Sequence, residues 1–319
     1  MITGAVRSLA AALAIAAGLG LGGCATPQSA ALRSPAGTPL AAVVEKLPRQ
    51  VKLAGVPFFP QSDYLCGPAS LAMALGALGR TRTPESLTAA LYVPARHGTL
   101  QAEMLAAPRR EGLLAIGMPA EIAALLRALA EGFPVVVFQN LGLTIAPFWH
   151  YAVLIGYDLD AGQLVLHSGS EESMPMTLDT FERTWARGGY WAMLVTTPQR
   201  IPAAASQHDA LRAAVSLERS DRAAALVAYR TLQARAPTDR LTLFALGNAL
   251  LADARAPAAA DTYRELLRLH PDFADGWNNL ANALAELGEV GPAREAAQRA
   301  IAIGGPGADA YRETAARLR

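Results

Sequence analysis

A period of 34 residues organises the last third of this 319-residue chain. The positions that recur at this spacing are two prolines (Pro237 and Pro271), three alanines (Ala225, Ala259 and Ala293) and two tyrosines (Tyr229 and Tyr263). A proline ends the helix that precedes it because its ring blocks continuation, and the small alanines let neighbouring helices approach closely. One repeat of this length cannot bury its apolar face alone. The pattern therefore predicts pairs of helices stacked side by side.

The repeat resembles the tetratricopeptide motif. Its fullest match is the third copy, with Trp277, Leu280, Ala281, Leu284, Gly288, Ala293 and Ala300, and the second copy supplies Leu243, Leu246, Gly247 and Leu250. The first copy is degenerate, because Asp209 and Arg212 stand where apolar residues are expected. The resemblance implies an all-α repeat domain over residues 205–319, with three repeats, a cap helix at 308–319 and a concave surface for a protein partner. The alternative is an unrelated alanine-rich helical bundle.

The N-terminus has the layout of an export signal. Arg7 precedes an apolar run over residues 9–21, which is shorter than the ~20 residues of a stable membrane span, and small residues lead up to Cys24. This resembles a bacterial lipoprotein signal and implies removal of residues 1–23, a lipid anchor on Cys24 and a place in the cell envelope. Because Ala25 is not acidic, the resemblance favours the outer membrane, facing the periplasm. The alternative is a plain secretory signal with a free thiol.

A flexible tether is expected after the signal. Residues 24–50 are rich in Ala, Pro, Ser and Gly and lack clear periodicity, which suits a linker rather than a core element.

Once Cys24 is lipidated, Cys66 is the remaining thiol and cannot form an internal disulfide. It precedes Gly67 and Pro68, and proline is favoured in the first turn of a helix. The positive end of a helix favours a thiolate, which is the nucleophilic form of cysteine. Gly67 would let substrate approach the backbone closely. Cys66 is therefore the candidate nucleophile.

Two further residues complete a candidate catalytic site. His150 opens a predicted strand and would form a thiolate–imidazolium pair with Cys66, then protonate the leaving amine. Gln61, five residues before the cysteine, is placed to donate its amide to the developing oxyanion. A helix that carries a nucleophile, followed by a sheet that carries its base, is the papain-type arrangement.

The motifs resemble those of papain-like peptidases that process double-glycine leaders of bacteriocins. The matching residues are Gln61, Cys66, Gly67, Pro68, Ala69 and Ser70, then His150, Tyr151, Val153, Leu154, Gly156, Tyr157 and Asp158, with a later segment of Leu178, Phe181 and Trp185. Helical spacing over 68–78 and 120–129, and strand patterns at 134–138, 151–157, 163–166 and 190–195, agree with this. The resemblance implies an α+β papain-like cysteine peptidase domain over residues 51–198, with an antiparallel sheet.

One position departs from that family, whose third catalytic residue is an Asp that orients the histidine. In this chain the corresponding position is occupied by His167 or Ser168. His167 would either orient His150 or be a partly buried histidine at a strand end. The nearby Asp158 and Asp160 fit a turn between two strands better than a catalytic role.

Two weaker candidates flank the expected cleft. Asn140 ends a valine-rich strand and would either bind substrate backbone or begin a loop, and Trp149 would either line the leaving-group side or pack in the core. The other histidines lack partners at metal-ligand spacing, so no metal or cofactor is expected. The net charge of +1, with acidic and basic residues interspersed, argues against nucleic-acid binding.

These observations predict a lipid-anchored envelope cysteine peptidase that acts on a protein or peptide. The repeats would recruit that substrate or a partner, and Cys24 would hold the chain on the membrane. Two alternatives remain open: a catalytically weak or inactive binding scaffold on the same fold, and another acyl transfer by the same residues.

Overall fold

The computed structural model describes residues 28–33, 44–61 and 64–318. The chain divides into two compact units, Met1–Lys46 and Leu47–Arg319. The signal segment and Cys24 lie outside the described residues. Within the expected tether, the helix α2 (Gln28–Arg33) forms, so that stretch is not wholly irregular. Its sequence consists mostly of residues with good helix propensity. None of the described helices combines the length and the apolar character needed to span a membrane.

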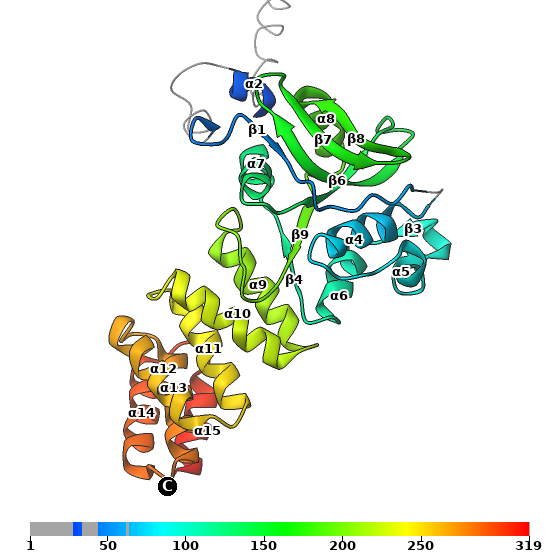
Figure 1. Ribbon diagram of the computed structural model, residues 1–319. Coiled ribbons are helices and arrows are strands. Elements are labelled where there is room, and N and C mark those ends of the chain that lie inside the picture. The colour runs from blue at the N-terminus through cyan, green and yellow to red at the C-terminus, as the bar shows by residue number, and fades with distance from the viewer. Residues whose placement is uncertain (1–27, 34–43, 62–63, 319) are drawn as a thin grey trace, which may run out of the picture. The chain divides into compact units, whose positions relative to one another are not determined.

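An antiparallel sheet forms the centre of the first half of the larger unit (Figure 1). Its strands are β1 (Gln50–Lys52), β4 (Leu114–Gly117), β5 (Val135–Asn140), β6 (Trp149–Asp158), β7 (Gln163–Ser168), β8 (Glu171–Thr177) and β9 (Ala192–Thr196). The order across the sheet is β4-β9-β5-β6-β7-β8, and β1 pairs with the C-terminal end of β6. A separate hairpin joins β2 (Tyr92–Val93) to β3 (Gly98–Thr99).

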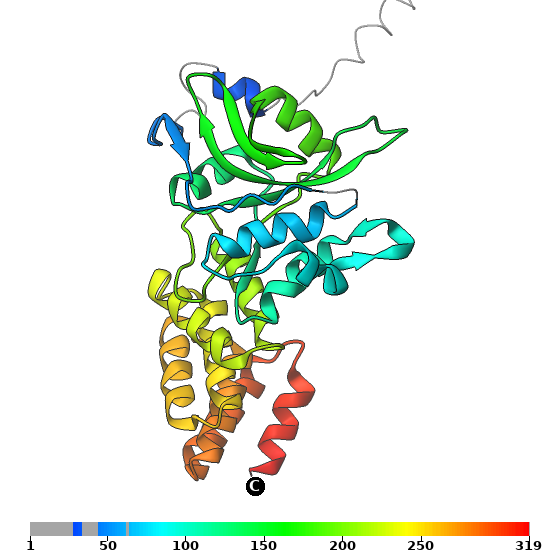
Figure 2. The same ribbon diagram turned by 45° about the vertical axis from the view of Figure 1, so that its right-hand side comes forward.

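Helices cover both faces of this sheet. The helix α4 (Cys66–Gly76) packs its apolar side chains against alternate residues of β6, among them Tyr151 and Val153. Figures 1 and 2 both show the ribbon of α4 next to the sheet. The helix α8 (Leu178–Arg187) packs on the opposite face, because Gln139 bonds to its Thr184 while the adjacent Phe138 joins the α4 core. The remaining helices of this half are α5 (Pro84–Leu91), α6 (Gln101–Arg109) and α7 (Ile122–Ala130).

The predicted helices at 68–78 and 120–129 and the four predicted strands are confirmed as α4, α7, β5, β6, β7 and β9. The strands β1, β2, β3, β4 and β8 and the helices α5 and α6 were not predicted. The hairpin strands and β4 are too short to carry a period. The strand β8 is polar, largely exposed and interrupted by Pro175, which an edge strand tolerates because one side of it needs no ladder hydrogen bonds.

The C-terminal part consists of helical pairs, as the 34-residue period predicts. The helices are α9 (Gln207–Glu218), α10 (Arg222–Arg235), α11 (Arg240–Ala252), α12 (Ala256–Leu269), α13 (Ala274–Glu286), α14 (Val290–Ile303) and the cap helix α15 (Ala308–Arg317). The recurring alanines Ala225, Ala259 and Ala293 are fully buried. Even the degenerate first copy forms a regular pair, α9 and α10.

One glycine tests how tightly the repeats pack. A Cβ at Gly247 in α11 would lie 2.5 Å from the ring of the buried Tyr263. We expect Gly247→Ala to lower the free energy of unfolding by about 1–3 kcal/mol, because overpacking a core costs that much. At Gly291 in α14 a Cβ would meet no atom within 4 Å.

The matched control Gly291→Ala is expected to leave the free energy of unfolding unchanged or to raise it by up to about 1 kcal/mol, since alanine favours a helix over glycine. Urea unfolding followed by circular dichroism measures both variants. Equal effects of the two substitutions would contradict the packing at Gly247.

Candidate active site

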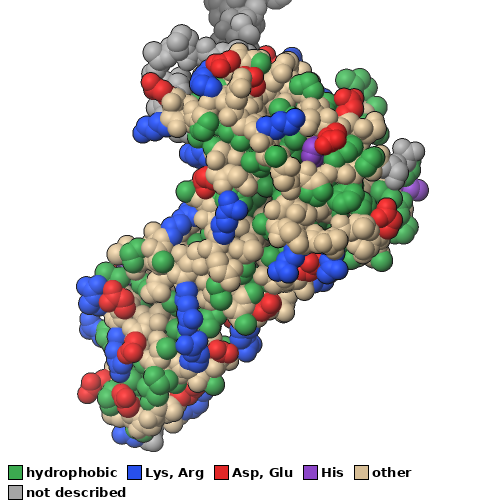
Figure 3. Space-filling model, in the orientation of Figure 1, with side chains coloured by type: hydrophobic (Ala, Val, Ile, Leu, Met, Phe, Trp, Pro, Cys, Tyr) green, Lys and Arg blue, Asp and Glu red, His purple; other side chains and the backbone are tan. Residues whose placement is uncertain are grey.

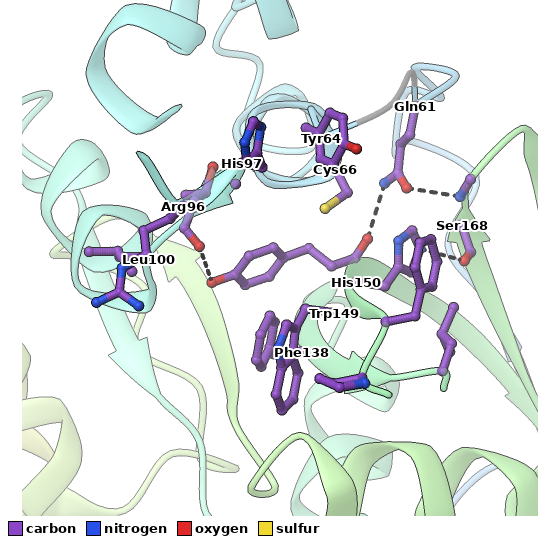
Figure 4. A pocket seen from close by; sticks show the side chains of 17 residues that line it. Gln61, Tyr64, Cys66, Arg96, His97, Leu100, Phe138, Trp149, His150 and Ser168 are labelled. Atoms are coloured by element: carbon purple, nitrogen blue, oxygen red, sulfur yellow. Dashed lines mark hydrogen bonds between the residues drawn. The ribbon is translucent and has the colours of Figure 1, made fainter. Parts of the chain in front are cut away.

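A cavity of about 800 Å³ opens where the start of α4 meets one end of β6 (Figure 4). One wall comes from the β2–β3 hairpin and the residue that follows it, and the opposite wall from the loop between β5 and β6. Of the residues predicted from sequence, five line this cavity: Gln61, Cys66, Trp149, His150 and Ser168. The structure therefore brings together side chains that lie up to 107 residues apart in the sequence.

Cys66 is the first residue of α4, as the sequence predicts. Burial raises the pKa of its thiol, and backbone N–H groups of Tyr151, Gly67 and Cys66 itself oppose that rise by favouring the thiolate. The contribution of Tyr151 places the sulfur beside β6, one residue after His150. The nucleophile thus lies against the strand that carries the candidate base.

His150 is 8% exposed and pairs with Gln139 across the sheet. Its Nε2 lies 2.9 Å from Ser168 Oγ. Burial lowers the pKa of the imidazole to about 4. When Nε2–H donates to the Ser168 hydroxyl, the lone pair of Nδ1 is available to accept a proton. His150 is therefore a neutral base in a fixed orientation at physiological pH.

The protonation states differ from the sequence-based expectation of a thiolate–imidazolium pair. Burial raises the pKa of Cys66 and lowers that of His150, so both shifts favour the neutral thiol and the neutral imidazole. The reason is desolvation, which disfavours both charged forms and which a local motif does not reveal.

Ser168, and not His167, is the hydrogen-bond partner of His150. His167 Nε2 lies 3.3 Å from Val56 O, and its Nδ1 accepts a bond from Ser173 N at 3.3 Å. The His167 ring also contacts Phe58, with the ring centroids 5.2 Å apart. Of the two roles considered for His167, the structure thus supports that of a buried strand-end residue.

Asp158 is the last residue of β6 and Asp160 lies in the turn that follows it, as expected from the sequence. Asp158 Oδ1 accepts the Ala161 N–H at 2.8 Å, and Asp160 forms an exposed ion pair with Arg49. Both lie at the end of β6 opposite His150, so neither is able to orient the imidazole.

The side chain of Gln61 forms hydrogen bonds with three segments around the cavity, namely α4, β6 and the turn after β7. Its Nε2 donates to Ser70 Oγ at 3.1 Å and to Tyr151 O at 3.2 Å, and its Oε1 accepts the Gly169 N–H at 2.9 Å. Both amide protons are therefore engaged. Donation to an oxyanion would require Gln61 to exchange one of these bonds when substrate binds.

Gly67 and Asn140 do not line the cavity. A Cβ on Gly67 would overlap the side chain of Thr99, so the glycine lets β3 pack on the head of α4. Asn140 is 2% exposed, and its Oδ1 accepts the N–H groups of Gly142 at 3.0 Å and Phe148 at 2.9 Å. The loop-forming alternative for Asn140 therefore describes this structure, and both residues support the walls of the cavity.

Sequence reasoning missed most of the two walls. The hairpin side contributes Arg96, His97 and Leu100, and the β5–β6 loop contributes Leu141 and Phe148. A hairpin with two-residue strands leaves no periodic signal, and its docking on α4 depends on contacts distant in sequence.

Comparison with known proteins agrees with this architecture. A family described as "Peptidase_C39 like family" matches residues 53–193. No curated protein matches the chain. Among solved structures, a C39-like peptidase from Bacillus anthracis is 20% identical, with a TM-score of 0.41, and covers 47% of this chain and 98% of its own.

Two further solved structures cover the two halves. A double-glycine-motif protease of an AMS/PCAT transporter, in complex with its leader peptide, is 25% identical, with a TM-score of 0.35, and covers 46% of this chain and 96% of its own. The Sgt2 TPR domain from Aspergillus fumigatus is 19% identical, with a TM-score of 0.33, and covers 35% of this chain and 76% of its own. The chain thus joins a papain-like domain, matched by the C39-like peptidase family over residues 53–193, to a tetratricopeptide-like helical domain.

Proposed function

We propose that the chain is a cysteine peptidase of the cell envelope that hydrolyses a peptide bond through Cys66 and His150. The observation that carries this proposal is the cavity that is lined by both the Cys66 thiol, at the start of α4, and a histidine whose Nε2 lies 2.9 Å from Ser168 Oγ. A neutral imidazole and a thiol that line one cavity supply the base and the nucleophile that acyl transfer needs.

The reaction follows from these groups. Cys66 Sγ attacks the peptide carbonyl carbon while its proton passes to His150 Nδ1, and the oxyanion forms beside the Cys66 N–H, with Gln61 as the second donor. His150 then gives the proton to the leaving amine as the C–N bond breaks, which leaves a thioester. Water, deprotonated by the same nitrogen, attacks the thioester and releases the acid, and the proton returns to the sulfur.

The cellular setting is proposed from the sequence. Lipid on Cys24 would anchor the chain on the outer membrane, facing the periplasm, with residues 24–50 as the tether to a peptidase domain over 51–198. The helical repeats over 205–319 would hold a protein substrate or partner.

A binding scaffold without catalysis is the second candidate, and one observation favours it. Ser168 supplies a neutral hydroxyl where an orienting carboxylate would stabilise the imidazolium. The same residues would also serve another acyl transfer if an amine, rather than water, resolved the thioester. The products separate these cases: hydrolysis yields a free acid, transfer yields a new amide, and a scaffold yields neither.

Thiol reactivity tests the catalytic pair without a known substrate. In the full chain carrying Cys24→Ser, Cys66 is the single thiol. We expect its alkylation by iodoacetamide to accelerate with pH up to and beyond about 8.5, the ordinary thiol pKa, because burial raises the pKa of Cys66. His150, with a pKa of about 4, is neutral throughout this range and gives no plateau at lower pH.

The matched variant is His150→Ala in the same Cys24→Ser chain. It is expected to slow alkylation near pH 7 by about tenfold or more, because the base that takes the thiol proton is gone. Identical rates in both chains at every pH would show that Cys66 is not coupled to His150, and would favour the scaffold.

A further inference from the structure

The cavity has an aromatic side and a cationic side. We propose, on the basis of the proposed peptidase function, that it selects peptides with an aromatic or long aliphatic side chain next to the scissile bond and a carboxylate that reaches Arg96. This specificity differs from a preference for small double-glycine segments.

The aromatic side is formed by strand residues close to the reacting groups. The rings of Phe138 and Trp149 stack with their centroids 5.3 Å apart at 10°, and Phe138 also contacts Tyr151 at 4.7 Å. Figure 4 shows the stacked pair in the same cavity as the thiol. Trp149 remains 51% exposed. An exposed aromatic surface inside a cavity is where a bulky apolar side chain of substrate gains most from leaving water.

This aromatic side is held rigidly. Asn140 accepts two backbone N–H groups of the β5–β6 loop, and Leu141 N donates to Phe148 O at 2.9 Å. Beyond the cavity the same loop exposes Leu143 and Ile145, the latter 92% exposed, and the space-filling view shows hydrophobic side chains on the surface of the sheet domain (Figure 3). The β5–β6 loop therefore carries apolar side chains both in the cavity (Leu141 and Phe148) and beyond it (Leu143 and Ile145), where an extended peptide would contact them.

The cationic side belongs to the hairpin. Arg96 lines the cavity at the short helix η1 (Pro94–Arg96), and among the described residues it forms no ion pair. No Asp or Glu occurs among the described residues that line the cavity. The hairpin is held in place because Thr99 O accepts the Tyr151 hydroxyl at 3.2 Å and His97 contacts the Tyr64 ring. Among the described residues, an arginine at the cavity without an acidic neighbour in the lining favours a carboxylate on the ligand.

The size of the cavity supports large side chains. At about 800 Å³ it lies in the upper part of the range for ligand pockets. A segment of two glycines would leave the Trp149 and Leu100 side chains facing water, whereas a Phe or Leu side chain would cover them. The proposed occupant is therefore a peptide, because the aromatic and aliphatic side chains line the same cavity as the thiol.

Binding to full-length Cys66→Ala tests the specificity apart from catalysis. The probes are fluorescein-labelled alanine-rich peptides that carry one Phe and one Glu at varied separation. We expect replacement of the Phe by Ala to weaken binding by about tenfold, and of the Glu by Lys by about fivefold, as measured by fluorescence anisotropy. In Cys66→Ala with Arg96→Glu, the preference between Glu and Lys is expected to reverse.

The matched control is Arg219→Glu, an exposed arginine at the end of α9, which should preserve the preference of Cys66→Ala for the Glu peptide. Binding with the expected preferences supports the specificity even if wild-type chain cleaves none of the peptides, in which case only the proposed hydrolysis fails. Equal affinities for all peptides, or an unchanged preference in Arg96→Glu, overturn it. Vesicle binding or self-association that depends on Ile145, with no peptide binding, would assign the apolar surface to a membrane or a second copy and also overturn it.

Discussion

Cys66→Ala is expected to abolish peptide hydrolysis, with a rate loss of about 10⁴-fold or more, since Cys66 is the only thiol among the described residues that line the cavity. The substrate is a pool of peptides from digested envelope proteins, and mass spectrometry of new termini measures cleavage. His150→Ala should give a loss of similar size, because two residues that act as one unit do not contribute additively. The double variant should then be no slower than either single one.

The chain offers its own control for the thiol. Cys24→Ser removes the other cysteine and should retain hydrolysis of the peptide pool, because its proposed role is anchoring. Unchanged thermal unfolding of Cys66→Ala would show that the loss is chemical rather than structural. Hydrolysis that persists in Cys66→Ala would refute the peptidase proposal, and a wild-type chain inert toward every peptide would favour the scaffold.

The parts of the fold that depend on local pattern could be predicted from the sequence. Pro68 marks the start of α4, and the apolar run after His150 marks β6, so the nucleophile and its candidate base could be placed on their elements. The repeats could also be predicted from the sequence, because each repeat contacts mainly its neighbours and the same residue spacing recurs. Gly247 and Tyr263, which pack against each other between α11 and α12, are both residues of the repeat motif.

The partner of His150 could not be predicted, because it depends on strand register. The pairing of β6 with β7 shifts between Leu154 and Gly156, and that of β7 with β8 shifts between Leu166 and Ser168. A slip of one residue exchanges the two faces of a strand. The choice between His167 and Ser168 therefore depends on bulges that leave no sequence signature.

Protonation in the site is likewise a tertiary property. The helix start at Cys66 correctly suggests that backbone N–H groups favour the thiolate, and they do oppose the shift. Burial beneath the hairpin and against β6 outweighs them, and neither the depth of the cavity nor the docking of the hairpin follows from the motif. Gln61 illustrates the same limit, since its two amide protons are committed to partners 9 and 90 residues away.

Ser168→Asp is expected to raise alkylation of Cys66 at pH 6 by about tenfold or more. A carboxylate next to Nε2 favours the charged imidazole and so raises the pKa of His150 from about 4. The imidazolium in turn stabilises the thiolate and lowers the pKa of Cys66. Between the two pKa values the ion pair is populated, so the rate of alkylation should gain a plateau on the acidic side that the parent chain lacks.

The matched control is Ser168→Asn, which is close in size to Asp but carries no charge. It should leave the rate at pH 6 near that of the parent Cys24→Ser chain, since a neutral partner does not favour imidazolium. Ser168 lines the cavity, so there is space for the longer side chain, and thermal unfolding of both variants checks the fold. Equal rates for Asp and Asn would contradict the role of Ser168. A plateau with Asp alone would show that one missing charge sets the resting state of this site.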